Sequence, residues 1–120
     1  MLYQMRRRDG SRDPFSSGTL ASPDGRTVHL SRDDYTLEAR DTWKSPQTGA
    51  IYPIRWHVNV PSQHLAFDVV AAMPNQELHT PRSTGVTYWE GAVDLQNGPR
   101  GRGYMELTGY NNVPLSDALR

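Results

Sequence analysis

The feature that most constrains the fold is a strict alternation of apolar and polar residues in short segments. In segment 54–60, the apolar positions all fall on one side of an extended chain: Ile54, Trp56, Val58 and Val60. The same alternation recurs in four further segments: 35–39, 64–71, 87–95 and 103–110. Successive side chains of a strand point to opposite faces, so this period of two predicts strands with one buried face. About seven or eight short strands at regular spacing predict an all-β antiparallel sandwich or barrel.

Turn residues separate these segments. Gly and Asn accept the positive φ that tight turns need, and they occur at Asp9-Gly10, Thr48-Gly49 and Asn97-Gly98. We expect the Asn97-Gly98 turn to join segments 88–96 and 101–110 as a hairpin. Segment 71–85 is rich in Pro, Asn, Ser and Thr, and it is expected to form a surface loop.

Length and charge set the class of protein. The 120 residues suit one domain, which we place at residues 1–112 with a C-terminal tail at 113–120. Thirteen basic residues balance thirteen acidic ones, so nucleic acid is not an expected partner. There is no cysteine for a disulfide framework, no signal-peptide pattern in MLYQMRRRDG and no apolar run long enough to span a membrane. The residues alone therefore predict no location in the cell.

Most familiar catalytic and metal-binding motifs are missing. The four histidines form no pair at helical or strand spacing, and no metal site is expected. There is no G-x-S-x-G motif, and GPRGRG at 98–103 does not lead from a strand into a helix as a phosphate loop does. No cofactor is expected. Arg55 and His57 lie opposite Trp56 on their segment and are expected to be solvated.

Two tyrosine–carboxylate pairs are the best candidates for chemistry. Residues two apart on a strand share a face, which groups Tyr88 with Glu90 and Tyr104 with Glu106. If the hairpin forms, all four residues lie on one side. The pattern leaves two alternatives open. The face is either an ordinary solvated surface or the lining of a cavity, where burial raises a carboxyl pKa and allows acid catalysis.

The apolar residues of the hairpin are expected on its opposite face. They are Trp89, Val93, Met105 and Leu107.

Three blocks in order carry a family resemblance: MLYQMRRRDGSRDPFSSGTL, WKSPQTGAIYPIRW and YWEGAV…GRGYMELTGY. From Met1 to about Tyr110 the chain resembles the second half of the hydroxyneurosporene synthase (carotenoid 1,2-hydratase) and AttH-like family, which includes predicted secreted hydrolases. The resemblance implies a lipocalin-like antiparallel β-barrel, the second of two in longer family members. It implies a truncated and incomplete barrel whose exposed edges are covered by a missing N-terminal barrel or by a homo-oligomer. It also implies an exported, periplasmic or membrane-associated location.

The resemblance further implies a lipophilic, isoprenoid-like ligand and a hydratase that works without a cofactor. In the hydratase branch, a Tyr-x-Asp motif supplies an acid and a His-x-Trp motif assists it. Here Tyr88-Trp89-Glu90 matches the first motif with Glu for Asp, and Trp56 matches the second with Ile54 for His.

These matches assign a role to each candidate residue. Glu90 is the candidate acid and Tyr88 its partner. Trp56, Tyr104 and Glu106 are expected to contact the substrate. Trp56 is preferred to Trp89, because Trp89 and Glu90 point to opposite faces of one strand. The alternative hypothesis is a non-catalytic lipocalin-like binding or structural module.

Overall fold

The computed structural model describes residues 1–7, 9–80 and 86–110, so the predicted boundary at 112 and the tail at 113–120 lie outside the described residues. The described chain forms eleven strands and one 3-10 helix: β1 (Leu2–Tyr3), β2 (Ser17–Ala21), β3 (Thr27–Ser31), β4 (Thr36–Ala39), β5 (Thr42–Lys44), β6 (Ile51–Pro53), β7 (Arg55–Val60), η1 (Pro61–Gln63), β8 (Leu65–Ala71), β9 (Glu77–Thr80), β10 (Val86–Gln96) and β11 (Gly101–Leu107). The prediction of an all-β chain is confirmed.

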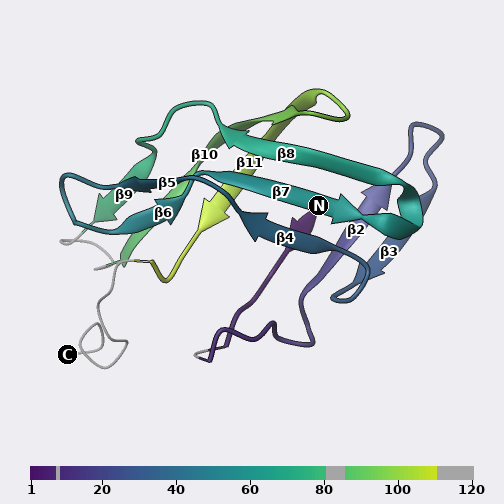
Figure 1. Ribbon diagram of the computed structural model, residues 1–120, viewed down its shortest axis with the longest axis horizontal. Helices are drawn as coiled ribbons and strands as arrows, with labels where there is room; N and C mark the ends of the chain where they lie inside the picture. The colour runs from purple at the N-terminus through teal and green to yellow at the C-terminus, as the bar shows by residue number, and fades with distance from the viewer. Residues whose placement is uncertain (8, 81–85, 111–120) are drawn as a thin grey trace.

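The strands form three antiparallel sheets. The largest has the order β11-β10-β8-β7-β4, with β9 also paired to β10. A second sheet has the order β1-β2-β3, and β5 pairs with β6 alone. Strands β7 and β8 run side by side along the length of the molecule, with the β2–β3 hairpin near one end and β5, β6 and β9 near the other (Figure 1). The result is a half-barrel.

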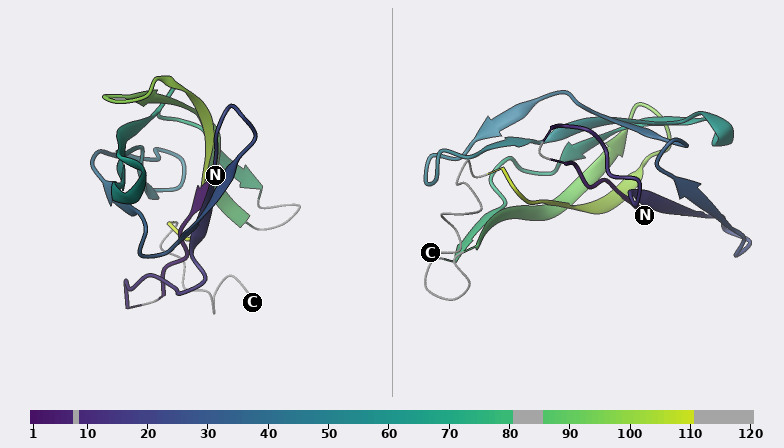
Figure 2. Two further views of the ribbon diagram at one scale, coloured as in Figure 1. Left: turned by 90° about the vertical axis from the view of Figure 1, so that its right-hand side faces the viewer. Right: turned by 90° about the horizontal axis from the view of Figure 1, so that it is seen from below.

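The strands curve around a common interior that two apolar clusters fill (Figure 2). The first interior cluster consists of Ala50, Tyr52, Trp89, Val93 and Leu107. The second interior cluster consists of Leu30, Tyr35, Val58 and Val60. Val69 on β8 packs against both, so the two clusters are continuous through the largest sheet.

The expected surface loop at 71–85 is partly wrong, because residues 77–80 form β9. Leu78 and Tyr88 face each other in its antiparallel pairing with β10. The Gln76 side chain extends this contact: its Nε2 donates to the Ala92 carbonyl at 3.0 Å and its Oε1 accepts from the Ala92 N–H at 3.0 Å. The polar composition of this segment did not indicate a strand, because the strand forms through pairing with β10 and not through a local apolar pattern.

The predicted hairpin between β10 and β11 is confirmed, with Leu95 opposite Gly101. Asn97 takes the positive φ of 57° that the turn requires. Gly98 serves another purpose, because a Cβ at this position would lie 2.2 Å from the Ala66 carbonyl oxygen on the neighbouring β8. The turn therefore packs directly against β8.

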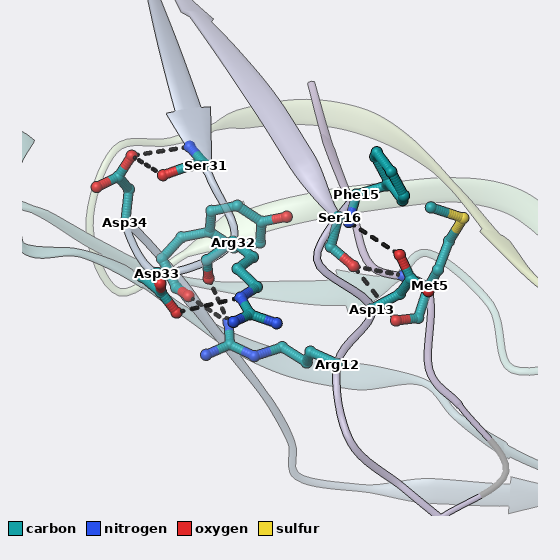
Figure 3. Close-up of polar contacts among 10 residues, drawn as sticks. Met5, Arg12, Asp13, Phe15, Ser16, Ser31, Arg32, Asp33 and Asp34 are labelled. Atoms are coloured by element: carbon teal, nitrogen blue, oxygen red, sulfur yellow. Dashed lines mark hydrogen bonds and ion pairs between the residues drawn. The ribbon is translucent and has the colours of Figure 1, made fainter.

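Polar contacts bind the N-terminal segment to the sheets (Figure 3). The Arg12 Nη1 donates to the carbonyls of Arg32, at 2.8 Å, and Tyr35, at 2.7 Å. The buried Ser16 hydroxyl accepts from the Met5 N–H at 2.9 Å. The two Arg12 bonds tie the N-terminal segment to the turn that precedes β4, which gives Arg12 a structural role.

Candidate functional site

Strands β10 and β11 bring the four Tyr and Glu candidates together, as the alternation predicts. Glu90 lies directly opposite Glu106, and Tyr104 is the neighbour of Glu106 on the same face. The pKa of Tyr104 is raised, first by partial desolvation and then by the negative charge of the neighbouring Glu90. We call this group of four residues, Tyr88, Glu90, Tyr104 and Glu106, the outer cluster.

The outer cluster faces away from the barrel interior. Tyr104 is 69% exposed and Glu106 is also exposed, while Tyr88 and Glu90 are half-buried. The alternate residues Trp89, Val93 and Leu107 are buried on the other face. The face assignment made from the sequence is therefore confirmed. Of the two alternatives that the pattern left open, a solvent-facing surface is the one observed.

Trp56 lies apart from the outer cluster. It packs against the first interior cluster and is half-buried, and its indole Nε1 donates to the Pro53 carbonyl at 3.1 Å. It is paired with Val69, which also points inward. The structure therefore does not bring Trp56 and Glu90 to the same face.

A set of aromatic rings lines one end of the interior. Tyr52 is fully buried, and the half-buried rings of Trp43 and Tyr110 both pack near it. The Trp43 and Tyr52 centroids are 6.2 Å apart with planes at 21°, and those of Tyr52 and Tyr110 are 6.0 Å apart with planes at 49°. Trp43, Tyr52, Tyr110 and Trp56, which all belong to or pack on the first interior cluster, form what we call the inner aromatic face.

Sequence reasoning missed a carboxylate at the edge of the inner aromatic face. Glu77 on β9 accepts from Ser45 at 2.6 Å, from Thr48 at 2.7 Å and from Tyr52 at 2.7 Å. Partial burial alone raises its pKa, but the three donated hydrogen bonds outweigh burial, and the pKa lies below its ordinary value. The same environment raises the pKa of Tyr52, first through burial and then through its bond to Glu77. The arrangement joins β9 to the turn between β5 and β6.

A second carboxylate, Asp68, collects donors on the outer face of β7 and β8. His57 Nδ1 lies 2.8 Å from Asp68, Arg55 Nη2 lies at 2.9 Å, and Asn97 Nδ2 donates at 2.8 Å. These bonds, that of His57 first, hold the pKa of Asp68 well below its usual range. Arg55 and His57 were expected to be solvated, but their side chains are only 33% and 34% exposed. The alternation places these residues on one face of each strand, but only the β7–β8 register, with His57 opposite Asp68, brings them together.

Three further features of the described residues do not indicate a functional site. Within the ranges 1–7, 9–80 and 86–110, no group of three or more His, Cys, Asp or Glu side chains is placed to hold a metal ion. An open depression of about 440 Å³ lies at the tip of the β10–β11 hairpin, where Asp94, Asn97 and Arg100 contribute to its lining. Among the described residues, no helix has the length and apolar character that crossing a bilayer requires.

Comparison with known proteins decides the family. The AttH-like family model matches residues 1–110. The chain belongs to the AttH-like family. A crystal structure assigned to AttH from Nitrosomonas europaea superposes with a TM-score of 0.82 at 35% sequence identity, and the match covers 91% of this chain and 33% of that one. No curated protein matches.

The lipocalin-like fold predicted from the resemblance is thereby confirmed for this AttH-like chain. The chain spans about a third of the length of that solved relative.

Proposed function

We propose that this AttH-like chain is a lipocalin-like domain that binds a lipophilic, isoprenoid-like molecule against its inner aromatic face. The observation that carries the proposal is the pair of half-buried rings, Trp43 and Tyr110, which both pack near the buried Tyr52. Lipophilic ligands bind to surfaces that are mostly apolar and aromatic, with a few polar groups that fix their orientation. Two polar groups lie beside this face: Glu77, which accepts from the Tyr52 hydroxyl, and Arg6, which donates to the Tyr110 hydroxyl.

A fluorescence titration tests the proposal. Farnesol is the probe, because it is an acyclic isoprenoid small enough to reach a partly open face. We expect it to change the tryptophan emission of the wild-type chain and to bind at least about tenfold more weakly to Trp43→Ala, which removes a large contact surface. Phe15→Ala is the control, because Phe15 is 77% exposed on the N-terminal segment. No binding to the wild type, or equal weakening in both variants, would refute the proposal.

A second candidate function is acid-catalysed hydration of an isoprenoid double bond at the outer cluster. Its support is the grouping of Glu90 with Tyr88 on one face of β10 and with Tyr104 and Glu106 on the facing strand β11. In this reaction the Glu90 carboxyl gives its proton to one alkene carbon. The oxygen of a water molecule then bonds to the tertiary carbocation, and the proton that water releases returns to the carboxylate.

Hydration is tested by Glu90→Gln, which keeps the shape of the side chain and removes its acidic proton. We expect the variant to lose formation of the water adduct of a terminal isoprenoid double bond, followed by mass spectrometry, while its far-ultraviolet circular dichroism stays unchanged. Glu38→Gln, at an exposed carboxylate of β4, is the matched control. Unchanged turnover in Glu90→Gln would eliminate Glu90 as the acid. A wild-type chain that binds farnesol without hydrating it would be the non-catalytic binding module.

A further inference from the structure

Among the described residues, strand β11 is one of the two edges of the largest sheet. It pairs with β10 on one side, and it is the last strand in the sheet order. Apart from its ladder with β10, no backbone hydrogen bond among the described residues involves positions 101–107. An edge strand with unpaired N–H and C=O groups is a ready template for pairing with another strand.

The register shows which groups of β11 point outward. On β10, the Glu90 N–H donates to Gln76 and the Ala92 carbonyl accepts from Ala72, so even-numbered residues of β10 bond away from β11. Odd-numbered residues of β10 therefore bond to β11, and their partners there are also odd-numbered, such as Met105 opposite Gly91. It follows that the backbone groups of three residues of β11 face the free edge: Arg102, Tyr104 and Glu106.

These three residues are complementary to themselves. If a second β11 lies antiparallel with Tyr104 opposite its own copy, Arg102 of each strand faces Glu106 of the other. Each of the three facing pairs can then exchange two backbone hydrogen bonds, because all three residues bond outward. Two opposite-charge pairs flank one aromatic pair, and cross-strand pairs of both kinds are stabilising.

Within a single chain, the carboxylates of Glu90 and Glu106 have no cationic partner among the described residues. Glu90 and Glu106 stand directly opposite each other, and neither appears in an ion pair within the described part of the chain. Like charges in this position are destabilising. The facing Arg102 of a second copy would place a cation next to Glu106 and relieve the repulsion.

The edge is also accessible. Arg102, Tyr104 and Glu106 are exposed, with Tyr104 at 69%. Gly101 and Gly103 belong to the opposite face of the strand and are exposed as well, so neither face of this half of the edge is covered by the described residues. Tyr104 is thus a large ring held in solvent at the centre of a self-complementary strand.

We propose that two copies of this chain associate through antiparallel pairing of their β11 strands, centred on Tyr104. The proposal is independent of the proposed ligand and of hydration. It places the outer clusters of the two copies side by side on one continuous sheet face, because β11 carries half of each cluster.

Charge exchange tests the pairing, with sedimentation velocity from micromolar to millimolar protein as the measurement. We expect the wild type to form a concentration-dependent dimer. Glu106→Arg replaces both attractive pairs by Arg–Arg repulsion and should weaken the dimer by roughly tenfold or more. This variant removes the Glu90–Glu106 repulsion within the chain, so its fold should be at least as stable, which thermal melting checks. Adding Arg102→Glu to it restores opposite charges across the pair and should restore the dimer.

A second variant tests the backbone bonds. Tyr104→Pro removes an N–H that points to the free edge and leaves the ladder with β10 intact. We expect this variant to be a folded monomer. A wild type that is monomeric throughout, a dimer that survives Glu106→Arg, or a double variant that stays monomeric would each overturn the proposal.

Discussion

At the scale of single residues, Glu77 stabilises the fold by holding three hydroxyl groups. Its two oxygens accept from Ser45, Thr48 and Tyr52, of which Ser45 and Tyr52 are almost fully buried. We expect Glu77→Ala to lower the free energy of unfolding by about 2–3 kcal/mol, because buried hydroxyls lose a charged acceptor. Glu77→Gln should cost less, since its amide oxygen still accepts. Urea denaturation measures both values, and a cost below that of the exposed control Glu38→Ala would contradict this role.

The contribution of Glu77 to stability is also expected to depend on pH. The pKa of Glu77 in the folded chain lies below its ordinary value of 4.5, so its ionised form contributes stability that is fully present above 4.5. That contribution is lost as the pH falls through the lowered folded value. Between neutral pH and about pH 3, the free energy of unfolding should therefore fall less for Glu77→Gln than for the wild type. Urea denaturation at the two pH values measures this difference. An equal decrease of the free energy of unfolding in the two proteins would contradict a stabilising role for the ionised Glu77.

The sequence could not indicate these contacts. Glu77 lies in a polar segment, and its donors lie 25 to 32 positions earlier in the chain, in the turn after β5 and on β6. Asp68 looked like an ordinary polar position of an alternating strand. Its three donors come from β7 and from the β10–β11 turn. Tertiary pairing determines both sites, and no local pattern records it.

At the scale of elements, the strand faces followed from local pattern because alternation is a property of the backbone itself. The β10–β11 hairpin was predicted with Trp89, Val93 and Leu107 on one face and Tyr88 and Glu90 on the other, as the structure has them. Whether a face points to solvent or to a closed lumen depends on how the sheet curves. The sequence therefore predicted the outer cluster as a group but left its environment open.

The turn of this hairpin packs closely against β8 at Gly98. A Cβ on residue 98 would lie 2.2 Å from the Ala66 carbonyl oxygen, and a backbone atom cannot yield as a flexible side chain does. We expect Gly98→Ala to destabilise the chain by about 1–3 kcal/mol through displacement of the turn from β8. Gly101→Ala is the matched control, because its added Cβ would meet Leu95 at an ordinary 3.5 Å. Thermal denaturation should separate the two, and equal melting temperatures would contradict close packing of the turn.

At the scale of the whole molecule, the two interior clusters of the half-barrel are joined through the largest sheet. Val69 contacts both clusters, and strands β7 and β8 each contribute residues to both of them. Because no boundary separates the clusters, we expect one cooperative unfolding transition. Trp89→Leu in the first cluster and Val60→Ala in the second should each lower the temperature of that single transition, because each leaves a cavity. Scanning calorimetry tests this, with equal calorimetric and van't Hoff enthalpies expected. Two separate transitions, or a variant that shifts only part of the heat absorption, would show that the clusters fold independently.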